Sequence, residues 1–348
     1  MAHWQLPVKP DFDSWGYGTA ILPVPGTSRV LLSLPTGGPR TPWCTIDVTT
    51  GQTLRGTGMP GYLRSAIFPP SQCDDPRPWV LGAYGLGRLE MDGRAKVTEV
   101  VRKSLGSYQT TLIDLGEGLL GVGHWRGKSL LLLSAVDSRA VKRLRVPGPG
   151  VSYRLPDGRV RILGLHYGQA TDIDVTQRAV VGRVPVPYGT SARHIDNTVI
   201  ALLGQRHDIR IVDDAADARP GGTVVLRVRP RLATGDQTAE PPTPPDLGWD
   251  VEPTEIAVLD ADDLTIRRSA PAPADAAEIL GTDPRGHIVA TTRHGLILLH
   301  PLTLAPVGSY HTPRPIDGAA LSPGGHTAAL LGAHHPATIT ALTWATAS

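Results

Sequence analysis

The chain has few of the residues on which disulfide-linked or membrane-spanning folds depend. Only two of its 348 residues are cysteines, Cys44 and Cys73, so a framework of disulfide bonds is excluded. The longest apolar runs, such as Leu130 to Leu133, are far shorter than the roughly 20 residues that cross a bilayer. The first residues lack the charged and then apolar segments of a secretory signal. We therefore expect a cytoplasmic protein without a membrane span.

Neither sign of charge dominates. The sequence has 34 Lys and Arg against 32 Asp and Glu, a formal net charge of +2, which excludes binding to a polyanion through gross charge. The basic segments Lys142–Arg145 and Arg227–Arg231 alternate as exposed strand faces do, so no nucleic-acid partner is expected. With 19% charged and 41% hydrophobic residues, general disorder is also excluded.

Several motifs of known enzyme classes are absent from the sequence. No Gly-rich loop precedes a helical pattern, so neither a dinucleotide site nor a P-loop is expected. The chain has no Gly-x-Ser-x-Gly elbow, no His-Glu-x-x-His and no Cys-x-x-Cys. We predict no cofactor from these patterns. A divalent metal stays open only if separate parts of the chain bring its ligands together.

Short strands fill almost the whole sequence. The 39 glycines and 33 prolines separate brief runs of β-branched and leucine residues, which predicts an all-β fold. An apolar pair, a polar residue, a turn and a second strand recur, for example from Ile46, Ile173 and Val258. Taking positions 47, 92, 134, 174, 260 and 300 as equivalent gives a period of roughly 40 residues with one doubled interval. Such a period is typical of a β-propeller built from four-stranded blades.

A second series of turns precedes the first. Tight turns with proline and glycine occupy Leu155–Arg159, Asp283–His287 and Ser322–Gly325. These turns, with an Asp-Val-Thr turn about 20 residues later, resemble the blades of bacterial WD-repeat-like and YVTN-like β-propellers. The only Trp-Asp pair, Trp249 and Asp250, does not stand at the end of a blade strand. The resemblance implies the fold.

The units predict a single seven-bladed propeller domain over residues 1–348, with four antiparallel strands per blade. The ring closes when His3–Val8 supplies the outer strand of the seventh blade, the alternative being a frayed N-terminus. The approximate blades are 15–60, 61–105, 106–147, 148–187, 188–273, 274–314 and 315–346.

The fifth unit is about twice as long as the others. We expect an insertion at about 209–254, formed by a β-hairpin and a Pro-rich loop. A lid over one face and a decorative insertion are both open interpretations. So is the identity of the third strand of this blade, either Asp208–Asp213 or the run that begins at Glu255.

Histidine returns at one position of successive blades, the turn between the second and third strands. In a propeller these turns surround one mouth of the central channel. Histidine titrates near neutrality and arginine grips carboxylates or phosphates, so the turns predict a site for a small polar or anionic molecule. The predicted catalytic residues are His124, His166, His207, His294 and His335.

The loops that enter the inner strands reach the same face and carry aromatic and charged residues. Aromatic rings can stack on a flat ligand, and a carboxylate can orient an imidazole. Tyrosines that pack between blades, and solvated turn residues, are the plainer interpretation. The predicted substrate-binding residues are Tyr17, Arg64, Tyr108, Arg126, Tyr188, Arg193, Arg206, Arg293, Asp275 and Asp317.

Two classes of function remain. The first is a metabolic or biosynthetic enzyme of lyase, cyclase or hydrolase type that uses histidine acid–base chemistry, as fold-level analogy suggests. The second is a non-catalytic scaffold that presents the same face, or the insertion, to a protein partner. An enzyme predicts a deep pocket with converging groups, whereas a scaffold predicts a flat rim.

Overall fold

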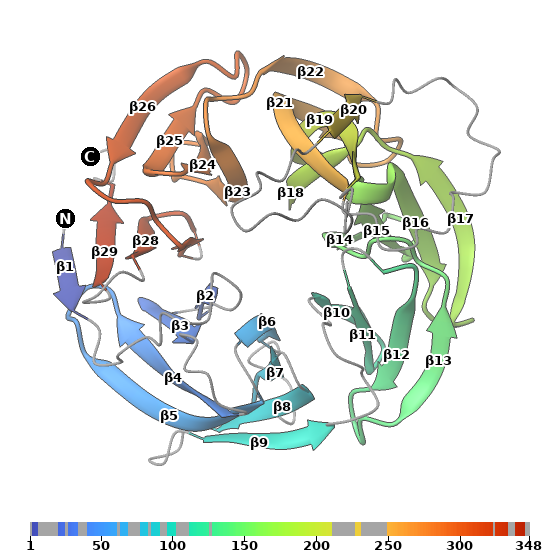
Figure 1. Cartoon of the computed structure of the whole chain (residues 1–348). Helices are drawn as coiled ribbons and strands as arrows, with labels where there is room; N and C mark the ends of the chain where they lie inside the picture. The colour runs from blue at the N-terminus through green and yellow to red at the C-terminus, as the bar shows by residue number, and fades with distance from the viewer. Residues whose placement is uncertain are drawn as a thin grey trace, which may run out of the picture.

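The computed structural model shows seven blades arranged around a common axis (Figure 1). Each blade contributes four antiparallel strands, as the period predicts, and the only helix in the described part of the chain is a single 3-10 turn. A single parallel bridge between Thr57 and Lys96 joins the first two blades into one sheet, and a fifth short strand is added to the fifth blade. None of the described residues forms a helix of the length and apolarity that a membrane crossing needs. The structure describes residues 2–5, 20–24, 27–33, 40–60, 63–68, 77–82, 85–90, 96–101, 111–124, 127–210, 227–230, 249–322, 324–332 and 338–344.

The first four blades follow the chain without interruption. Blade one has β2 (Ala20–Pro23), β3 (Arg29–Ser33), β4 (Arg40–Asp47) and β5 (Thr53–Pro60). Blade two has β6 (Leu63–Ile67), β7 (Trp79–Gly82), β8 (Gly85–Glu90) and β9 (Lys96–Val101). Blade three has β10 (Thr111–Gly116), β11 (Leu119–Gly123), β12 (Leu130–Ser134) and β13 (Ala140–Leu144). Blade four has β14 (Ser152–Arg154), β15 (Val160–Gly164), the 3-10 turn η1 (Leu165–Tyr167), β16 (Gln169–Asp174) and β17 (Ala179–Pro185).

The last three blades include the long unit and the ring closure. Blade five has β18 (Gly189–Ile195), β19 (Thr198–Arg210), β21 (Trp249–Asp260) and β22 (Ile266–Pro271), with β20 (Arg227–Pro230) beside β19. Blade six has β23 (Ala276–Thr282), β24 (Ile288–Thr292), β25 (Gly295–Leu299) and β26 (Pro306–His311). Blade seven has β27 (Gly318–Leu321), β28 (Thr327–Gly332), β29 (Thr338–Thr343) and, from the other end of the chain, β1 (Ala2–Gln5).

The N-terminal strand closes the ring. β1 pairs antiparallel with β29, from Ala2 opposite Ala341 to Gln5 opposite Thr338. This arrangement confirms the predicted outer strand of blade seven and covers an edge of β29 that would otherwise offer unpaired backbone groups. It also ties the first and last parts of the chain into one sheet.

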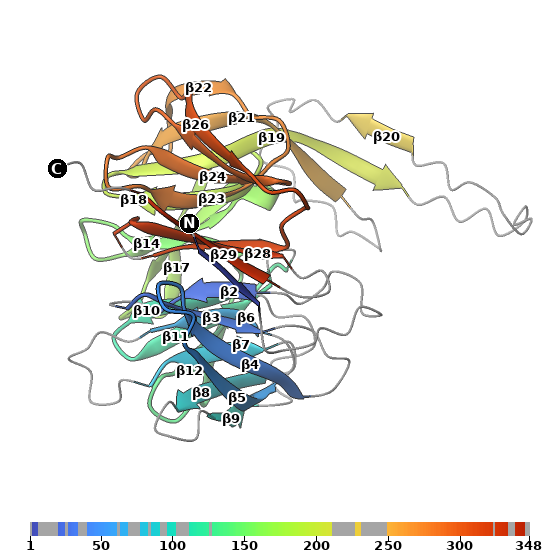
Figure 2. The ribbon, with the colours of Figure 1, turned by 90° about the vertical axis from the view of Figure 1, so that its left-hand side faces the viewer.

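In blade five the third strand is β21, the alternative that keeps the period. β19 and β21 pair from Thr198 opposite Asp260 to Asp208 opposite Trp249. Figure 2 shows this ladder running beyond the body of the propeller, with β20 along its edge. The ends of the predicted insertion, at about 209 and 254, therefore fall within or beside the two longest strands of the structure.

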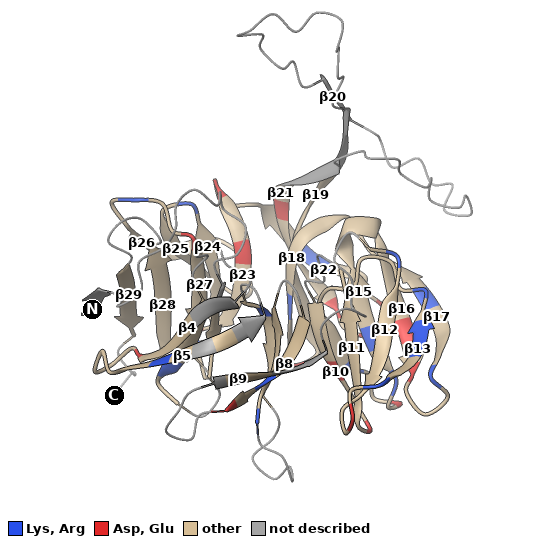
Figure 3. Cartoon of the chain, turned by 60° about the horizontal axis from the view of Figure 1, so that its bottom comes forward, with Lys and Arg blue, Asp and Glu red and all other residues tan. Residues whose placement is uncertain are grey.

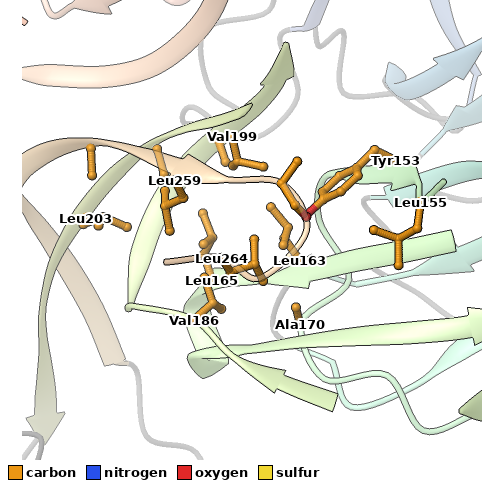
Figure 4. Packing of buried hydrophobic residues seen from close by; sticks show 14 residues of the cluster. Tyr153, Leu155, Leu163, Leu165, Ala170, Val186, Val199, Leu203, Leu259 and Leu264 are labelled. Atoms are coloured by element: carbon orange, nitrogen blue, oxygen red, sulfur yellow. The ribbon is translucent and has the colours of Figure 1, made fainter. Parts of the chain in front are cut away.

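Apolar cores lie between neighbouring blades. One of them joins blades four and five and includes Leu163, Leu165, Val199, Leu203 and Leu259, all buried (Figure 4). Each fully buried side chain of this size contributes about 1.5–3 kcal/mol. The blades are thus held to one another mainly by leucine and valine contacts.

In blades one, three, four, five and six the turns between third and fourth strands are stabilised by the same kind of hydrogen bond. The last residue of the third strand, or the next one, accepts hydrogen bonds from backbone N–H groups two or three residues on, as in an Asx turn. The acceptors are Asp47, Ser134, Asp174, Asp260 and the Nδ1 atom of His300. Burial alone would raise the pKa of Asp47, but hydrogen bonds from Thr49, Ser28 and Thr50 lower it well below its ordinary value. Positions 47, 134, 174, 260 and 300 are equivalent as predicted, whereas β8 ends at Glu90, two residues before the predicted position 92.

Candidate functional site

Three of the histidines predicted for the mouth, His124, His166 and His294, lie between second and third strands, whereas His207 lies within a second strand. His124 follows β11, His166 lies in η1, His207 belongs to β19, and His294 lies between β24 and β25. His335, Tyr17, Tyr108 and Arg126 lie outside the described residues, and for Arg206 and His207 only the strand is described.

Tyr188 lies against Gly168, directly after the 3-10 turn that holds His166. The ring of His166 is only 7% exposed and meets the ring of Tyr167 edge to face, with 6.1 Å between centroids. Gly168 has a φ of +65°, and a Cβ atom there would lie 2.9 Å from Cε1 of Tyr188. Glycine thus lets the tyrosine ring cover η1. The side chain of His166 therefore lies buried beneath the surface of this face.

Backbone hydrogen bonds tie two predicted residues of blade six to the segment that leads into blade seven. The N–H of Thr312 donates to the carbonyl of His294 at 2.6 Å, and the N–H of Ile316 donates to that of Arg293 at 2.9 Å. The N–H of Asp317 donates to the carbonyl of Leu331 at 2.8 Å. Arg293 and Asp317 are exposed, so this part of the mouth presents charge on a fixed backbone.

Two arginines predicted in the loops that enter inner strands belong to the strands themselves. Arg64 lies in β6 and Arg193 in β18, because the ladders to the second strands already begin at Leu63 and Gly189. Nε of Arg193 donates to the carbonyl of Ile279 on β23, at 3.3 Å. In Figure 3 both signs of charge are interspersed over the described blades.

The remaining predicted acid, Asp275, is exposed in the loop before β23. Its φ is +58°, a left-handed conformation that aspartate adopts more readily than most residues. The N–H of Ala276 donates to the carbonyl of Pro273 at 3.1 Å and closes this loop. Asp275 therefore lies in a tight turn just before the first strand of blade six.

A buried ion pair within blade four also binds backbone carbonyls of blade five, and the sequence analysis missed it. Arg161 on β15 grips Asp172 on β16 through two hydrogen bonds of 2.7 and 2.8 Å, with side chains 4% and 3% exposed. The same guanidinium donates to the carbonyls of Ala261 and Asp262 in blade five. Because the partners stand about 100 positions apart, no local spacing signals the contact.

Two aromatic residues lie at the same contact between blades four and five. The hydroxyl of Tyr153 donates to the carbonyl of Ala261 at 2.7 Å, and burial raises the pKa of this phenol to about 12. The ring of His194 stacks on that of Tyr153 with centroids 4.2 Å apart and planes 1° from parallel. Burial lowers the pKa of His194, and the charge of Asp196 opposes this change. Figure 4 shows Tyr153 beside the apolar core of the joint.

A second cluster missed by the sequence analysis lies on the opposite face, at the turn between β23 and β24. Asp283 accepts a hydrogen bond of 2.9 Å from Nδ1 of His287. Together with Arg285, Leu298, Val307 and Trp344, these two residues line a hollow between blades six and seven. The sequence signal was the Asp and His that flank Pro284, Arg285 and Gly286.

The described residues contain neither a reactive thiol nor a group of metal ligands. Cys44 is buried, and burial raises the pKa of its thiol to about 12 against the opposing charge of Arg55, so the thiol stays protonated. Within the described ranges, no three His, Cys, Asp or Glu side chains are grouped closely enough to hold a metal ion.

The fold and the contacts between its blades define a WD-repeat-like seven-bladed β-propeller. No family model matches the sequence, and no curated protein matches it. Among solved structures, the chain is similar to the WD40 domain of Pan2 from Neurospora crassa, with a TM-score of 0.62 and 12% identity. The match covers 96% of this chain and 91% of that one, and at this identity it establishes the fold.

Proposed function

We propose that the protein is a non-catalytic interaction scaffold that binds a protein partner through the face carrying the loops between second and third strands. The observation that carries the proposal is the placement of the predicted mouth residues. His166 is buried, whereas Asp275, Arg293 and Asp317 are exposed in separate loops of blades six and seven. Exposed charges spread over several loops suit a broad protein surface.

Two loops of this face that the structure describes support the same function. The loops at Arg293 and Asp317 are fixed by backbone hydrogen bonds, and the N-terminal strand closes the ring. A surface that is already ordered loses little conformational entropy on binding. Similarity to a WD40 domain over nearly the whole chain fits this function at the level of fold.

The enzymatic hypothesis, with rim histidines acting on a small polar or anionic molecule, stays a prediction. So do its metabolic or biosynthetic role, the bacterial origin and the cytoplasmic location. The aspartate–histidine hydrogen bond that the structure shows, between Asp283 and His287, lies on the other face. It therefore supports a separate site rather than catalysis at the mouth.

The test begins with affinity capture of partners on the full chain. The captured protein is then produced pure and titrated by calorimetry against the wild type, Arg293→Glu and Arg178→Glu. Arg178 is an exposed turn residue on the opposite face, so its variant is a control with the same charge change. We expect Arg293→Glu to weaken binding at least tenfold, about 1.4 kcal/mol, and the control to leave it unchanged.

Two results would contradict the proposal. Equal affinity of the wild type and Arg293→Glu for every captured partner would place binding elsewhere. Turnover of a metabolite that is abolished by His294→Ala would show that the protein is an enzyme.

A further inference from the structure

Two turns between first and second strands have the same backbone. Leu155–Arg159 and Asp283–His287 both carry proline second and glycine fourth. In each turn the first N–H donates to the fifth carbonyl, at 2.8 and 2.9 Å, and the glycine N–H donates to the first carbonyl at 2.9 Å. The glycines have φ of +87° and +80°. The blade-four turn shows that this geometry needs no acid at its first position.

Blade six nevertheless places an aspartate there. Asp283 is 5% exposed, as buried as Leu155 at 6%. Its Oδ1 accepts the N–H groups of Arg285 and His287 at 2.9 and 2.8 Å, and its Oδ2 accepts Nδ1–H of His287 at 2.9 Å. These bonds use the carboxylate internally and fix the imidazole, so Nε2 is turned away from Asp283.

The fixed histidine stands at a hollow with one apolar side and one cationic edge. The hollow is small, about 210 Å³, which is less than the roughly 300–1,000 Å³ of a pocket that encloses a small-molecule ligand. Its apolar lining comes from Leu298, Val307 and Trp344. Val307 keeps 49% of its surface exposed, so this lining is accessible from outside.

Arg285 supplies the positive edge. It is exposed, and within the described part of the chain its guanidinium makes no hydrogen bond or ion pair. The carboxylate of Asp283 accepts three hydrogen bonds within its own turn, and none of them comes from the Arg285 guanidinium. The hollow thus offers a free guanidinium and an oriented imidazole next to apolar carbon, a combination that attracts an anion attached to an apolar group.

We infer that this hollow, defined by Asp283, Arg285, His287, Leu298, Val307 and Trp344, docks an acidic peptide segment of a partner protein. One peptide carboxylate binds the Arg285 guanidinium beside the ring of His287. A neighbouring apolar side chain packs on Leu298, Val307 and Trp344. A peptide fits better than a free metabolite because small ligands are usually enclosed over most of their surface, whereas this hollow is open. The site lies on the face opposite the one proposed above and does not depend on it.

The experiment uses the full chain and an array of peptides in which aspartate alternates with leucine or phenylalanine. Each peptide is paired with its asparagine counterpart, and the strongest binder is titrated by fluorescence anisotropy. We expect the acidic form to bind at least tenfold more tightly than the amide form. Arg285→Glu and Trp344→Ala each lower the affinity at least tenfold. Arg178→Glu, which makes the same charge change on the same face two blades away, leaves it unchanged.

Thermal unfolding of each variant shows that any loss of affinity is not a loss of fold. Equal binding of acidic and amide peptides, equal binding by Arg285→Glu, or no binding by the wild type across the array would overturn the inference. Displacement of the peptide by inorganic phosphate or free aspartate at the peptide's own half-saturating concentration would do so too, since it would define a small-anion site. Arg293→Glu, the variant of the other face, separates the two proposals because it leaves peptide binding intact.

Discussion

The turns Leu155–Arg159 and Asp283–His287 share one backbone and use their neighbouring charges in opposite ways. In blade four the turn contributes the buried side chain of Leu155. The nearby ion pair of Arg161 and Asp172 is buried at the contact between blades four and five. In blade six the buried residue is an aspartate, which holds His287 at an open hollow beside Arg285. Proline and glycine fix the turn, so the other three positions are free to serve either packing or recognition.

The largest effect is expected from breaking the ion pair of blade four. Asp172→Ala leaves Arg161 buried without its carboxylate and should cost about 3–5 kcal/mol of unfolding free energy, measured by urea denaturation. The double variant Arg161→Met with Asp172→Leu should recover most of that loss, because no charge is then left buried. A loss below 1 kcal/mol for the single variant would show that the pair does not hold the joint.

Next in size is the apolar position of the blade-four turn. Leu155→Ala removes a buried side chain and opens a cavity, so we expect a loss of about 2–4 kcal/mol in the same assay. The matched variant Asp283→Ala loses three hydrogen bonds at a partly solvated turn and should cost about 1–2 kcal/mol. Equal losses would remove the distinction between a turn used for packing and one used for recognition.

A smaller effect is expected from the phenol of the joint. Tyr153→Phe removes one hydrogen bond to the carbonyl of Ala261 and should cost about 1 kcal/mol. Denaturant titration beside the wild type measures it. A higher free energy of unfolding for the variant would mean that the buried hydroxyl destabilises the protein and does not help to hold blades four and five together.

The smallest effect is a pH dependence at His194. Because burial lowers its pKa in the folded protein, the unfolded chain binds the proton more tightly, and stability falls as pH drops below the ordinary histidine value of about 6.5. His194→Phe keeps a ring on Tyr153 and removes the titration. Urea midpoints measured from pH 8 to 5 should therefore fall less in the variant than in the wild type, and parallel curves would contradict the assignment.

Much of the fold is predictable from the sequence because similar turn residues recur from blade to blade. The acceptors at Asp47, Asp174 and Asp260 mark the turns between third and fourth strands, and the tight turns at Pro156 and Pro284 mark those between first and second strands. Both kinds of turn are local, so a single sequence carries them. Seven blades and the closing N-terminal strand follow from counting the turns.

The sites are less predictable because their partners come from different blades. Arg161 finds its acceptors in the turn after β21, about 100 residues away, and nothing in the local sequence indicates that pairing. Histidines at recurring positions are easily noticed, yet recurrence does not fix exposure, and His166 is buried. Asp283 and His287 are only four residues apart, and comparison with Leu155 and Arg159 would have shown that the acid is not needed by the turn.

The most direct test of the account converts one turn into the other. The triple variant Asp283→Leu, Arg285→Asp and His287→Arg gives blade six the turn residues of blade four, and the unchanged Pro284 and Gly286 keep the backbone. Unfolding free energy and affinity for the acidic peptide are measured on the same preparation. The account predicts stability within about 1 kcal/mol of the wild type and at least tenfold weaker peptide binding. A folded variant that binds the peptide as tightly as the wild type would contradict it.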